Sequence, residues 1–473
     1  KMETSSTNRR DFLKFLGFST VAATLVACEA PVMKAIPYVN RPDEITPGVA
    51  NWYASSFFDG HDYASILGKT REGRPIKLEG NTLSKITMGG LSARVQASVL
   101  SLYDSSRLKG PKMKSGNAWA DKTWNEIDTA IGAKLTQSKG IAILSSTIIS
   151  PSTKAAIAEF SRKYSNVRHV TYDSISYSGM LKANLSSFGK AMIPTYRFDN
   201  AEVIVSLGAD FLANWLSPIE HAKQYGMTRK VSKNKKTMSK HYQFESILSL
   251  TGSNADERYP VKPSQLAQIA LGLLNGVGGG GSASTVFSKE VAKVAAELKA
   301  ANGKGLVVCG SNDAALQMIV NEINKSINNK GITIDWDKED FTHQGDDAAL
   351  KKLVEDMGSS VDTVIFYNTN PVYSTPAAVG FEAAMKKLSC RISFSGMLDE
   401  TAAMCDFVCP DHHYLESWND HNPRKGHYSI QQPAIRPLFS TRHAQETLLA
   451  WSGNKTNYHS YIQKYWQSNM LPM

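Results

Sequence analysis

The sequence predicts an α/β fold in which two similar doubly wound, Rossmann-like modules follow one another in tandem, preceded by a small β-rich N-terminal domain. Apolar strands alternate with amphipathic helices, a pattern typical of parallel sheets. This alternation restarts after a Gly- and Ser-rich segment at 276–284. The length of 473 residues, with 42 % apolar and 20 % charged residues, suits several globular domains.

The composition excludes several classes of protein. No apolar stretch reaches the roughly 18 to 20 residues that a membrane-spanning helix needs. The five cysteines include no C-x-x-C pair, which argues against a disulfide framework, a zinc ribbon or an iron–sulfur motif in this sequence. The formal net charge of +10 permits an anionic partner, but the basic residues are spread along the chain, and nucleic-acid binding is not expected.

Residues 1–28 have the pattern of a twin-arginine export signal followed by a lipidation site. The motif residues are Arg9, Arg10, Phe12, Leu13 and Lys14. The apolar stretch at 15–27 is long enough for a signal peptide and too short to span a membrane. It ends in Leu-Val-Ala-Cys, which is similar to a lipobox, and Cys28 is therefore the expected lipidation site. The alternative is an amphipathic surface helix with a buried Cys28.

The β-rich domain is expected over 29–110, where short segments are punctuated by Pro and Gly. Strand character is found at Tyr63–Leu67 and Pro75–Glu79, and the polar residues Thr70–Arg74 predict the turn between them.

The first α/β module is expected over 111–275. Its predicted helices and strands are Trp124–Leu135, Gly140–Ser145, Pro151–Tyr164, Val167–Tyr172 and Ala201–Leu207. Its basic segment at 229–240 predicts a solvated loop. The segment at 276–284 is expected to be a linker to the second module.

The second α/β module is expected over 285–440. Its predicted helices and strands are Val291–Ala300, Gly305–Cys309, Ala314–Ile327, Val361–Tyr367 and Cys390–Ser395. Residues 441–473 are expected to form a helical tail that leads to a C-terminal region outside this sequence.

Two turns follow apolar strands at the positions where doubly wound sheets bind ligands. They are Gly208-Ala209-Asp210 and Asn368-Thr369-Asn370-Pro371. Such turns present backbone N–H groups to a phosphate-bearing cofactor, but neither has a G-x-G-x-x-G pattern. A tight turn with a capping side chain is the alternative for both.

Two polar clusters near residue 410 are the remaining candidates for chemistry. Cys405, Cys409, His412 and His413 could supply four zinc ligands in number. However, Phe407-Val408 has the pattern of a buried strand, which would place the two cysteines on one face about 13 Å apart, too far for one ion. Glu416, Asp420 and His421 could act in acid–base chemistry, but no nucleophile supports them, and a polar loop is expected at 416–420.

Six segments of the sequence form an ordered set of motifs. They are Tyr-Asp-x-x-Arg-Leu-Lys-x-Pro at 103–111, Thr-Trp-Asn-Glu-Ile at 123–127, Asp-Asn-Ala-Glu-Val-Ile-Val-Ser-Leu-Gly-Ala-Asp at 199–210, Tyr-Pro-Val-Lys-Pro-Ser at 259–264, Phe-Tyr-Asn-Thr-Asn-Pro-Val at 366–372, and the segment at 399–416 that begins Asp-Glu-Thr-Ala. Taken in order, these segments resemble the molybdopterin oxidoreductase superfamily. The resemblance implies the fold of that superfamily. The departures are a missing Cys-rich iron–sulfur motif, whose place at 52–67 contains no cysteine, and a missing metal-ligand motif in the first module.

The N-terminal motif and the segments at 36–39, 69–77 and 409–420 carry a narrower resemblance. Together they resemble the large peripheral subunit of alternative complex III, a quinol-oxidising membrane complex. The resemblance implies a non-catalytic, lipid-anchored structural region on the periplasmic side of the bacterial cytoplasmic membrane. It implies no catalytic, cofactor-binding or metal-binding residue in this sequence, and [4Fe-4S] or [3Fe-4S] clusters in a continuation of the chain.

The partners implied by this resemblance are a multihaem cytochrome c, which carries haem c, integral quinol-binding subunits, a terminal oxidase, and membrane lipid through Cys28. Two alternatives stay open. One is an active periplasmic molybdopterin oxidoreductase, and the other is a two-lobed periplasmic module that binds a small anion.

Overall fold

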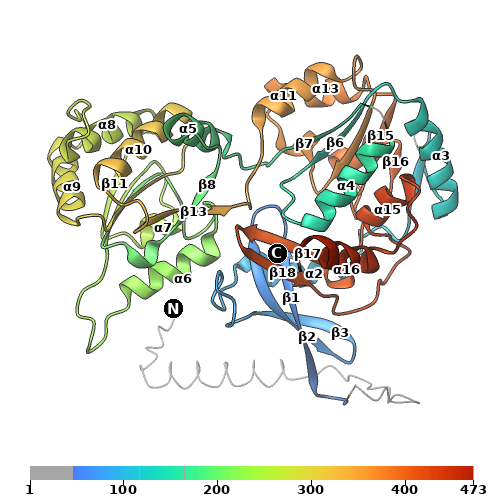
Figure 1. Ribbon diagram of the computed structural model, residues 1–473, viewed down its shortest axis with the longest axis horizontal. Coiled ribbons are helices and arrows are strands. Elements are labelled where there is room, and N and C mark those ends of the chain that lie inside the picture. Colours follow the sequence, from blue (N-terminus) through green and yellow to red (C-terminus); the bar gives the residue numbers. More distant parts are fainter. Residues whose placement is uncertain (1–45, 117, 165, 472–473) are drawn as a thin grey trace, which may run out of the picture. The chain divides into compact units, whose positions relative to one another are not determined.

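The computed structural model describes residues 46–116, 118–164 and 166–471 (Figure 1). From Pro47 onward the described residues form one compact unit. The predicted export residues and the predicted lipidation site at Cys28 lie outside the described residues, so both stay predictions.

The described part of the β-rich domain is a three-stranded antiparallel sheet with one helix packed on it. The strands are β1 (Ala50–Phe58), β2 (Tyr63–Arg71) and β3 (Arg74–Gly80), and the helix is α2 (Ala93–Ser101). Glu72 and Gly73 form the two-residue turn between β2 and β3, with φ angles of 52° and 75°. These left-handed angles suit the tight turns that join antiparallel strands, which confirms the turn predicted at this position.

The larger α/β part is built on a seven-stranded sheet. Its order is β5-β4-β16-β15-β14-β6-β7, and the five strands from β16 to β7 are parallel. The bounds are β4 (Lys112–Ser115), β5 (Ala118–Asp121), β6 (Ile141–Ser145), β7 (Val167–Thr171), β14 (Thr363–Tyr367), β15 (Cys390–Ser393) and β16 (Phe407–Val408). The hairpin β4–β5 pairs antiparallel with β16 and forms one edge.

Helices cover both faces of this sheet, which explains why its central strands β6 and β14 are apolar runs with every residue buried (Figure 1). In β6, Ile141 and Ile143 pack toward α3, α4 and α15, whereas Ala142 and Leu144 pack toward α11 and α13. The helix bounds are α3 (Trp124–Gln137), α4 (Pro151–Lys163), α11 (Asp347–Asp356), α13 (Phe381–Met385) and α15 (Ala444–Trp451). The predicted helical tail at 441–473 therefore includes a helix of this layer.

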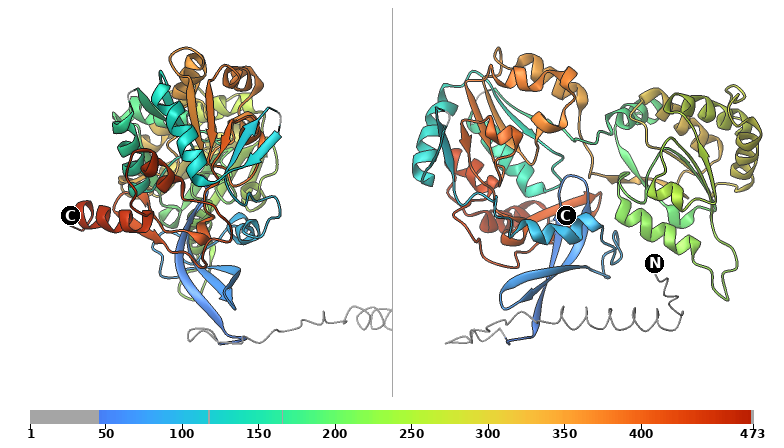
Figure 2. Two further views of the ribbon diagram at one scale, coloured as in Figure 1. Left: turned by 90° about the vertical axis from the view of Figure 1, so that its right-hand side faces the viewer. Right: turned by 180° about the vertical axis from the view of Figure 1, so that it is seen from behind.

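The smaller α/β part has a four-stranded parallel sheet in the order β11-β10-β9-β12. Helices again lie on both sides of the strands, as the view from behind in Figure 2 also shows. The strands are β9 (Val203–Leu207), β10 (Lys240–Glu245), β11 (Glu257–Pro260) and β12 (Gly305–Cys309), and the helices are α5 (Ser178–Phe188), α6 (Pro218–Arg229), α8 (Leu266–Val277), α9 (Ser288–Ala300) and α10 (Ala314–Ser326).

A fourth, antiparallel sheet joins segments from distant parts of the chain. Its order is β18-β17-β13-β8, with β8 (Ile193–Tyr196), β13 (Ile334–Asp340), β17 (Asn419–Arg424) and β18 (His427–Gln431). The remaining helices are η1 (Phe198–Asn200), α7 (Leu250–Ser253), η2 (Pro263–Gln265), α12 (Pro371–Ser374), η3 (Ala377–Val379), α14 (Glu400–Ala403), η4 (Tyr414–Glu416) and α16 (Tyr458–Asn469).

The predicted α/β fold is confirmed, but its two parts are not consecutive halves of the chain. The larger sheet takes β4–β7 from the first predicted module and β14–β16 from the second, while the smaller sheet is made by the segment between them. The segment predicted as a linker at 276–284 connects α8 to α9 within the smaller part. Local pattern predicts strands and helices, whereas the choice of pairing partner depends on contacts far apart in sequence.

Candidate functional site

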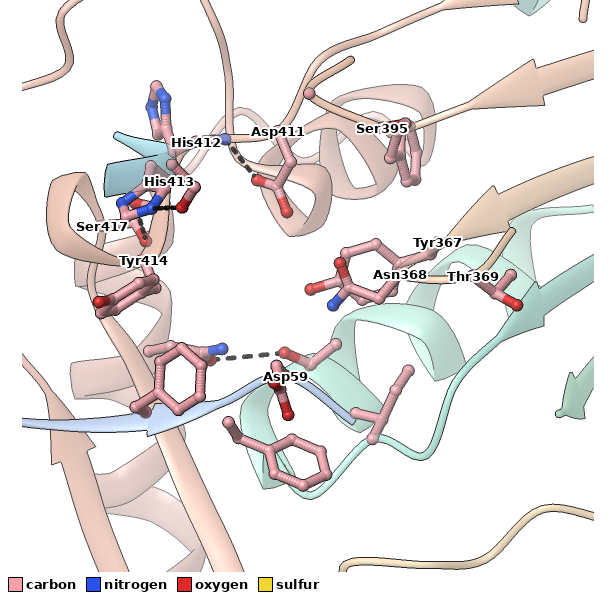
Figure 3. A pocket seen from close by; sticks show the side chains of 18 of the residues that line it. Asp59, Tyr367, Asn368, Thr369, Ser395, Asp411, His412, His413, Tyr414 and Ser417 are labelled. Atoms are coloured by element: carbon pink, nitrogen blue, oxygen red, sulfur yellow. Dashed lines mark hydrogen bonds between the residues drawn. The ribbon is translucent and has the colours of Figure 1, made fainter. Parts of the chain in front are cut away.

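A cavity of about 740 Å³ lies at the carboxyl ends of the parallel strands of the larger sheet (Figure 3). Thr147 and Ile148 follow β6, Asn368 and Thr369 follow β14, and Ser395 follows β15. The opposite wall includes the end of β1 and one side of α2. Parallel doubly wound sheets bind their ligands at this edge, and the cavity volume lies in the range of roughly 300–1,000 Å³ that small-molecule sites have.

The two turns predicted as cofactor-binding turns use their polar groups within the protein. Asp210 Oδ1 accepts hydrogen bonds from the N–H and hydroxyl groups of Thr251 at 3.0 and 2.6 Å. Asn370 Oδ1 likewise accepts hydrogen bonds from the N–H and hydroxyl groups of Thr401 at 3.1 and 2.7 Å. The N–H of Ala209 donates to the Ser206 hydroxyl group. The structure therefore supports the reading of these segments as capped turns, repeated in the two sheets.

The helix that follows β6 has an internal carboxylate at its N-terminus. Asp420 is fully buried and accepts hydrogen bonds from the Ser152 N–H at 3.3 Å and the Ser152 hydroxyl at 2.6 Å. Its other donors are the Ser150 hydroxyl at 2.5 Å and the Trp466 indole N–H at 2.7 Å. The Thr153 N–H donates to Ser150 Oγ. A helix N-terminus is a favourable place for a phosphate group, and here the protein's own side chains take its donors.

A buried ion pair borders the cavity. Arg107 donates to Glu416 through Nη2–Oε2 at 2.7 Å and Nη1–Oε1 at 3.3 Å, and it also donates to the Leu102 carbonyl at 2.8 Å. The side chains of Arg107 and Glu416 are 6 % and 0 % exposed. Burial would raise the pKa of Glu416, but the hydrogen bonds from Arg107 and from the N–H groups of Leu438 and His413 outweigh it and lower that pKa.

The second arginine of the cavity wall is also paired. Arg94 Nη2 lies 3.0 Å from Asp62 Oδ1, and Arg94 Nε lies 3.7 Å from Asp59 Oδ2. No lysine is among the described lining residues. Every cationic side chain that the structure places on the cavity wall is thus held by a carboxylate.

Asp411 is a carboxyl group of the cavity without a cationic partner. Its Oδ1 accepts hydrogen bonds from the N–H groups of His412 and Ala444 at 2.7 and 2.9 Å. Figure 3 shows the carboxyl group facing the space that separates it from Tyr367, Asn368 and Asp59. Burial, reinforced by the nearby charge of Glu416, raises the pKa of Asp411 to about 7.

The four histidines of the cavity wall are uncharged at neutral pH. Burial lowers the pKa of His443 to about 3 and the pKa values of His413 and His421 to about 4. It also lowers the pKa of His412, whose Nδ1 pairs with the Thr441 hydroxyl group. Each of these histidines resists protonation because a charged imidazole would be poorly solvated at its position.

The structure does not assemble the zinc site that was considered at 405–413. Cys409 packs among the residues under α3, α4 and α15, and Cys405 packs among those under α11 and α13. The expectation that both cysteines share one face is therefore wrong, because β16 is only two residues long and both cysteines lie outside it. Burial raises the pKa of Cys390 to about 12 and raises those of Cys405 and Cys409 as well. The described residues include no group of three or more His, Cys, Asp or Glu side chains that could hold a metal ion.

The acid–base cluster considered at 416–421 is also separated. Glu416 pairs with Arg107, Asp420 caps α4, and His421 Nδ1 lies 2.9 Å from the Ser56 hydroxyl group. The polar loop expected at 416–420 is wrong in its second half, because β17 begins at Asn419. Residues from Asn419 onward form a strand because they pair with β18, although their polar composition does not predict one.

Sequence reasoning did not single out three polar residues that line the cavity, Asp411, His443 and Gln445. Asp411 lies between residues that were considered as candidates. His443 directly precedes α15, and Gln445 lies in the first turn of that helix. The position of Asp411 three residues after the buried strand Phe407–Val408 was an available signal, because residues just beyond the end of such a strand lie at the ligand-binding edge of a sheet.

The basic segment at 229–240 is a mostly exposed loop between α6 and β10, as predicted, although Arg229 still belongs to α6 and Lys240 to β10. Within the loop, Ser239 is buried and Lys235 is partly buried. Lys235 Nζ donates to the carbonyl groups of Met227 and Thr228 at 2.7 and 2.8 Å and so holds the loop against α6. Within the part of the chain that the structure describes, no helix is both long enough and apolar enough to cross a membrane.

Comparisons with known proteins agree on a family and a fold. A family model described as molybdopterin oxidoreductase matches residues 107–446. The menaquinone reductase, molybdopterin-binding-like subunit of Nitratidesulfovibrio vulgaris (strain Hildenborough) is 24 % identical over 511 aligned positions, which cover 94 % of this chain and 72 % of that protein. The structure of acetylene hydratase from Pelobacter acetylenicus superposes with a TM-score of 0.64 at 11 % identity, covering 85 % of this chain and 70 % of that one.

Proposed function

The chain belongs to the molybdopterin oxidoreductase family, and from this premise we propose that it is a subunit of a respiratory membrane complex that exchanges electrons with a quinone. Similarity to a subunit of a menaquinone reductase supports this role. The finer proposal is an alternative complex III, in which quinol is oxidised and a c-type cytochrome or an oxidase receives the electrons. The N-terminal motif and the segments at 36–39, 69–77 and 409–420 support the finer proposal.

Within that complex, we propose that the described region is structural and holds no molybdopterin. Such a cofactor carries phosphate groups, which require cationic side chains or free N–H groups. The cavity wall has no lysine among its described residues, and both of its arginines are paired with carboxylates. The residues present do not fit the cofactor.

The observation that carries this proposal is the position of Asp420 at the N-terminus of α4. A carboxylate of the chain occupies the place that follows β6, where a doubly wound sheet would bind phosphate. A phosphate group there would lie against a buried negative charge that already has four donors. Because like charges in a buried site repel strongly, the N-terminus of α4 is not available to a phosphate group.

Metal and pterin analysis of the complex isolated from its native membrane tests this role. We expect molybdenum and tungsten far below one atom per chain, no pterin fluorescence after acid oxidation, and retained quinol-dependent reduction of a c-type cytochrome. Stoichiometric molybdenum or tungsten would show that the chain is an active molybdopterin enzyme. Absence of quinol-dependent electron transfer in an intact complex would contradict the respiratory assignment.

We further propose that export through the twin-arginine route and lipidation of Cys28 place the chain on the periplasmic side of the membrane. Its proposed partners are a multihaem cytochrome c, integral quinol-binding subunits and a terminal oxidase, with iron–sulfur clusters in a continuation of the chain. A Cys28→Ala variant is expected to fold normally and to lose the mass of the lipid. An identical N-terminal peptide mass in wild type and variant, apart from the substitution itself, would exclude the lipid anchor.

A further inference from the structure

The cavity at the edge of the larger sheet has an excess of negative charge. Its described lining residues include the carboxylates Asp59, Asp399 and Asp411 and the cations Arg94 and Arg107. Arg107 is neutralised by Glu416, and Arg94 by Asp62 with Asp59 nearby. The four lining histidines are neutral at neutral pH because burial lowers their pKa values. Asp399 and Asp411 are therefore uncompensated by any cation on the wall.

Two acceptor atoms in this cavity lack a partner. Asp411 Oδ1 has two N–H donors, whereas Oδ2 has no hydrogen bond from a described residue. Gln445 lines the same cavity and is 1 % exposed, and its Oε1 has no hydrogen-bond partner among the described residues. Its amide nitrogen is already used by Thr153 and Tyr367. Asp411 is only partly buried and its carboxyl group faces the cavity (Figure 3), whereas Gln445 Oε1 is a buried acceptor of the kind that normally finds a donor. A ligand that donates hydrogen bonds would satisfy both atoms.

Aromatic rings form much of the remaining wall. Tyr367 and Phe394 lie edge to face with ring centroids 6.1 Å apart, and Phe57 and Tyr414 do so at 4.9 Å. Aromatic faces attract cations and accept apolar groups. An anion would meet uncompensated carboxylates, and a neutral apolar ligand would leave the acceptors without donors.

We propose that this cavity binds a small organic ammonium ion, whose N–H groups donate to Asp411 Oδ2 and Gln445 Oε1 while its apolar body lies against Tyr367 and Phe394. The cation supplies both the missing positive charge and the missing donors. This inference does not depend on the respiratory assignment, because it concerns only the side chains of the cavity.

Isothermal titration of the protein in its native assembly at pH 8 tests the proposal, with 2-phenylethylammonium as the probe and neutral 2-phenylethanol as its matched analogue. We expect saturable binding of the cation and at least tenfold weaker binding of the alcohol. Asp411→Asn should weaken binding of the cation at least tenfold. The control Glu382→Gln removes an exposed carboxylate outside the cavity and should leave binding unchanged. Equal affinity for cation and alcohol, or no binding of the cation up to 10 mM (roughly the weakest affinity of interest), would overturn the proposal.

The pH dependence provides a test that needs no variant. The titratable groups around Asp411 are Glu416, Tyr367, His412 and His443. The pKa of Tyr367 is raised and those of Glu416, His412 and His443 are lowered, so all four shift away from the range around pH 7 in which Asp411 titrates. Protonation of Asp411 should therefore weaken binding of the cation several-fold from pH 8 to pH 6. An affinity that does not change over this range, or pyrophosphate binding that is tighter than binding of the cation, would refute the assignment.

Discussion

Replacing Arg107 by Met should destabilise the fold more than any loss of a surface ion pair. The substitution leaves Glu416, whose side chain is 0 % exposed, without its guanidinium partner at 2.7 Å, and it leaves the Leu102 carbonyl without a donor. Removing one member of a buried ion pair typically costs about 3–5 kcal/mol. Two N–H groups, those of Leu438 and His413, remain bonded to Glu416. We therefore expect the free energy of unfolding to fall by about 3 kcal/mol, near the lower end of this range.

Urea unfolding followed by circular dichroism measures this loss. The matched control is Lys386→Met, which removes an ion pair at 2.7 Å whose side chains are 63 % and 56 % exposed. Exposed pairs contribute about 0–1 kcal/mol. The double variant Arg107→Met/Glu416→Gln should recover part of the loss because the buried charge is gone. If Arg107→Met and Lys386→Met shift the midpoint equally, the reasoning from burial is refuted.

Four further variants test packing and electrostatics in both α/β parts. Gly310→Ala should lower the free energy of unfolding by at least about 1–3 kcal/mol, because the new methyl group would lie 2.3 Å from the Gly208 carbonyl oxygen. Gly226→Ala, whose new methyl group has no neighbour within 4 Å, should raise it by up to about 1 kcal/mol. Thermal melts that rank the two variants otherwise would contradict this packing. Asp420→Ala should lower the free energy of unfolding by about 1–3 kcal/mol, because it leaves buried donors without an acceptor. Urea unfolding measures this change, and an unchanged midpoint would argue against the capping role of Asp420. Because the pKa of Asp411 is raised, the folded state loses stability as the pH rises from about 4, the pKa of the unfolded chain, to about 7, the pKa of the folded protein. Asp411→Asn should remove this loss and should therefore be more stable than the wild type at pH 8. Equal melting temperatures of the two proteins at pH 8 would count against this reasoning.

Much of the local structure follows from pattern alone. The strand Gly305–Cys309 has the bounds that its apolar run predicts, because a glycine and a polar turn delimit five residues that are all buried. The helix expected from Pro151 begins there, because Ser150 caps it and Pro suits the first helical position. The buried strand Phe407–Val408 was also predicted. In each case the cause lies within a few residues of the element.

The candidate site could be predicted only in part. The turns after β9 and β14 were located from sequence, but their use as capped turns depends on Thr251 and Thr401, which lie 41 and 31 residues further along the chain. The segment at Asn419 was expected to be a loop and is a strand, since its partner strand supplies the hydrogen bonds that its polar side chains do not predict. Asp411 gave no sign of an unusual pKa, because that property comes from the neighbours that bury it.

The order of apolar and polar residues therefore established the α/β class and several of the helices and strands, and the ordered motifs between residues 103 and 416 indicated the likeness to one family. The tertiary structure decided which strands share a sheet, which carboxylates are neutralised, and where a cavity remains. The reason is the range of the interactions. Helix caps and strand alternation act over a few residues, whereas the pair Arg107–Glu416 joins positions 309 residues apart, and such contacts exist only after the chain has folded.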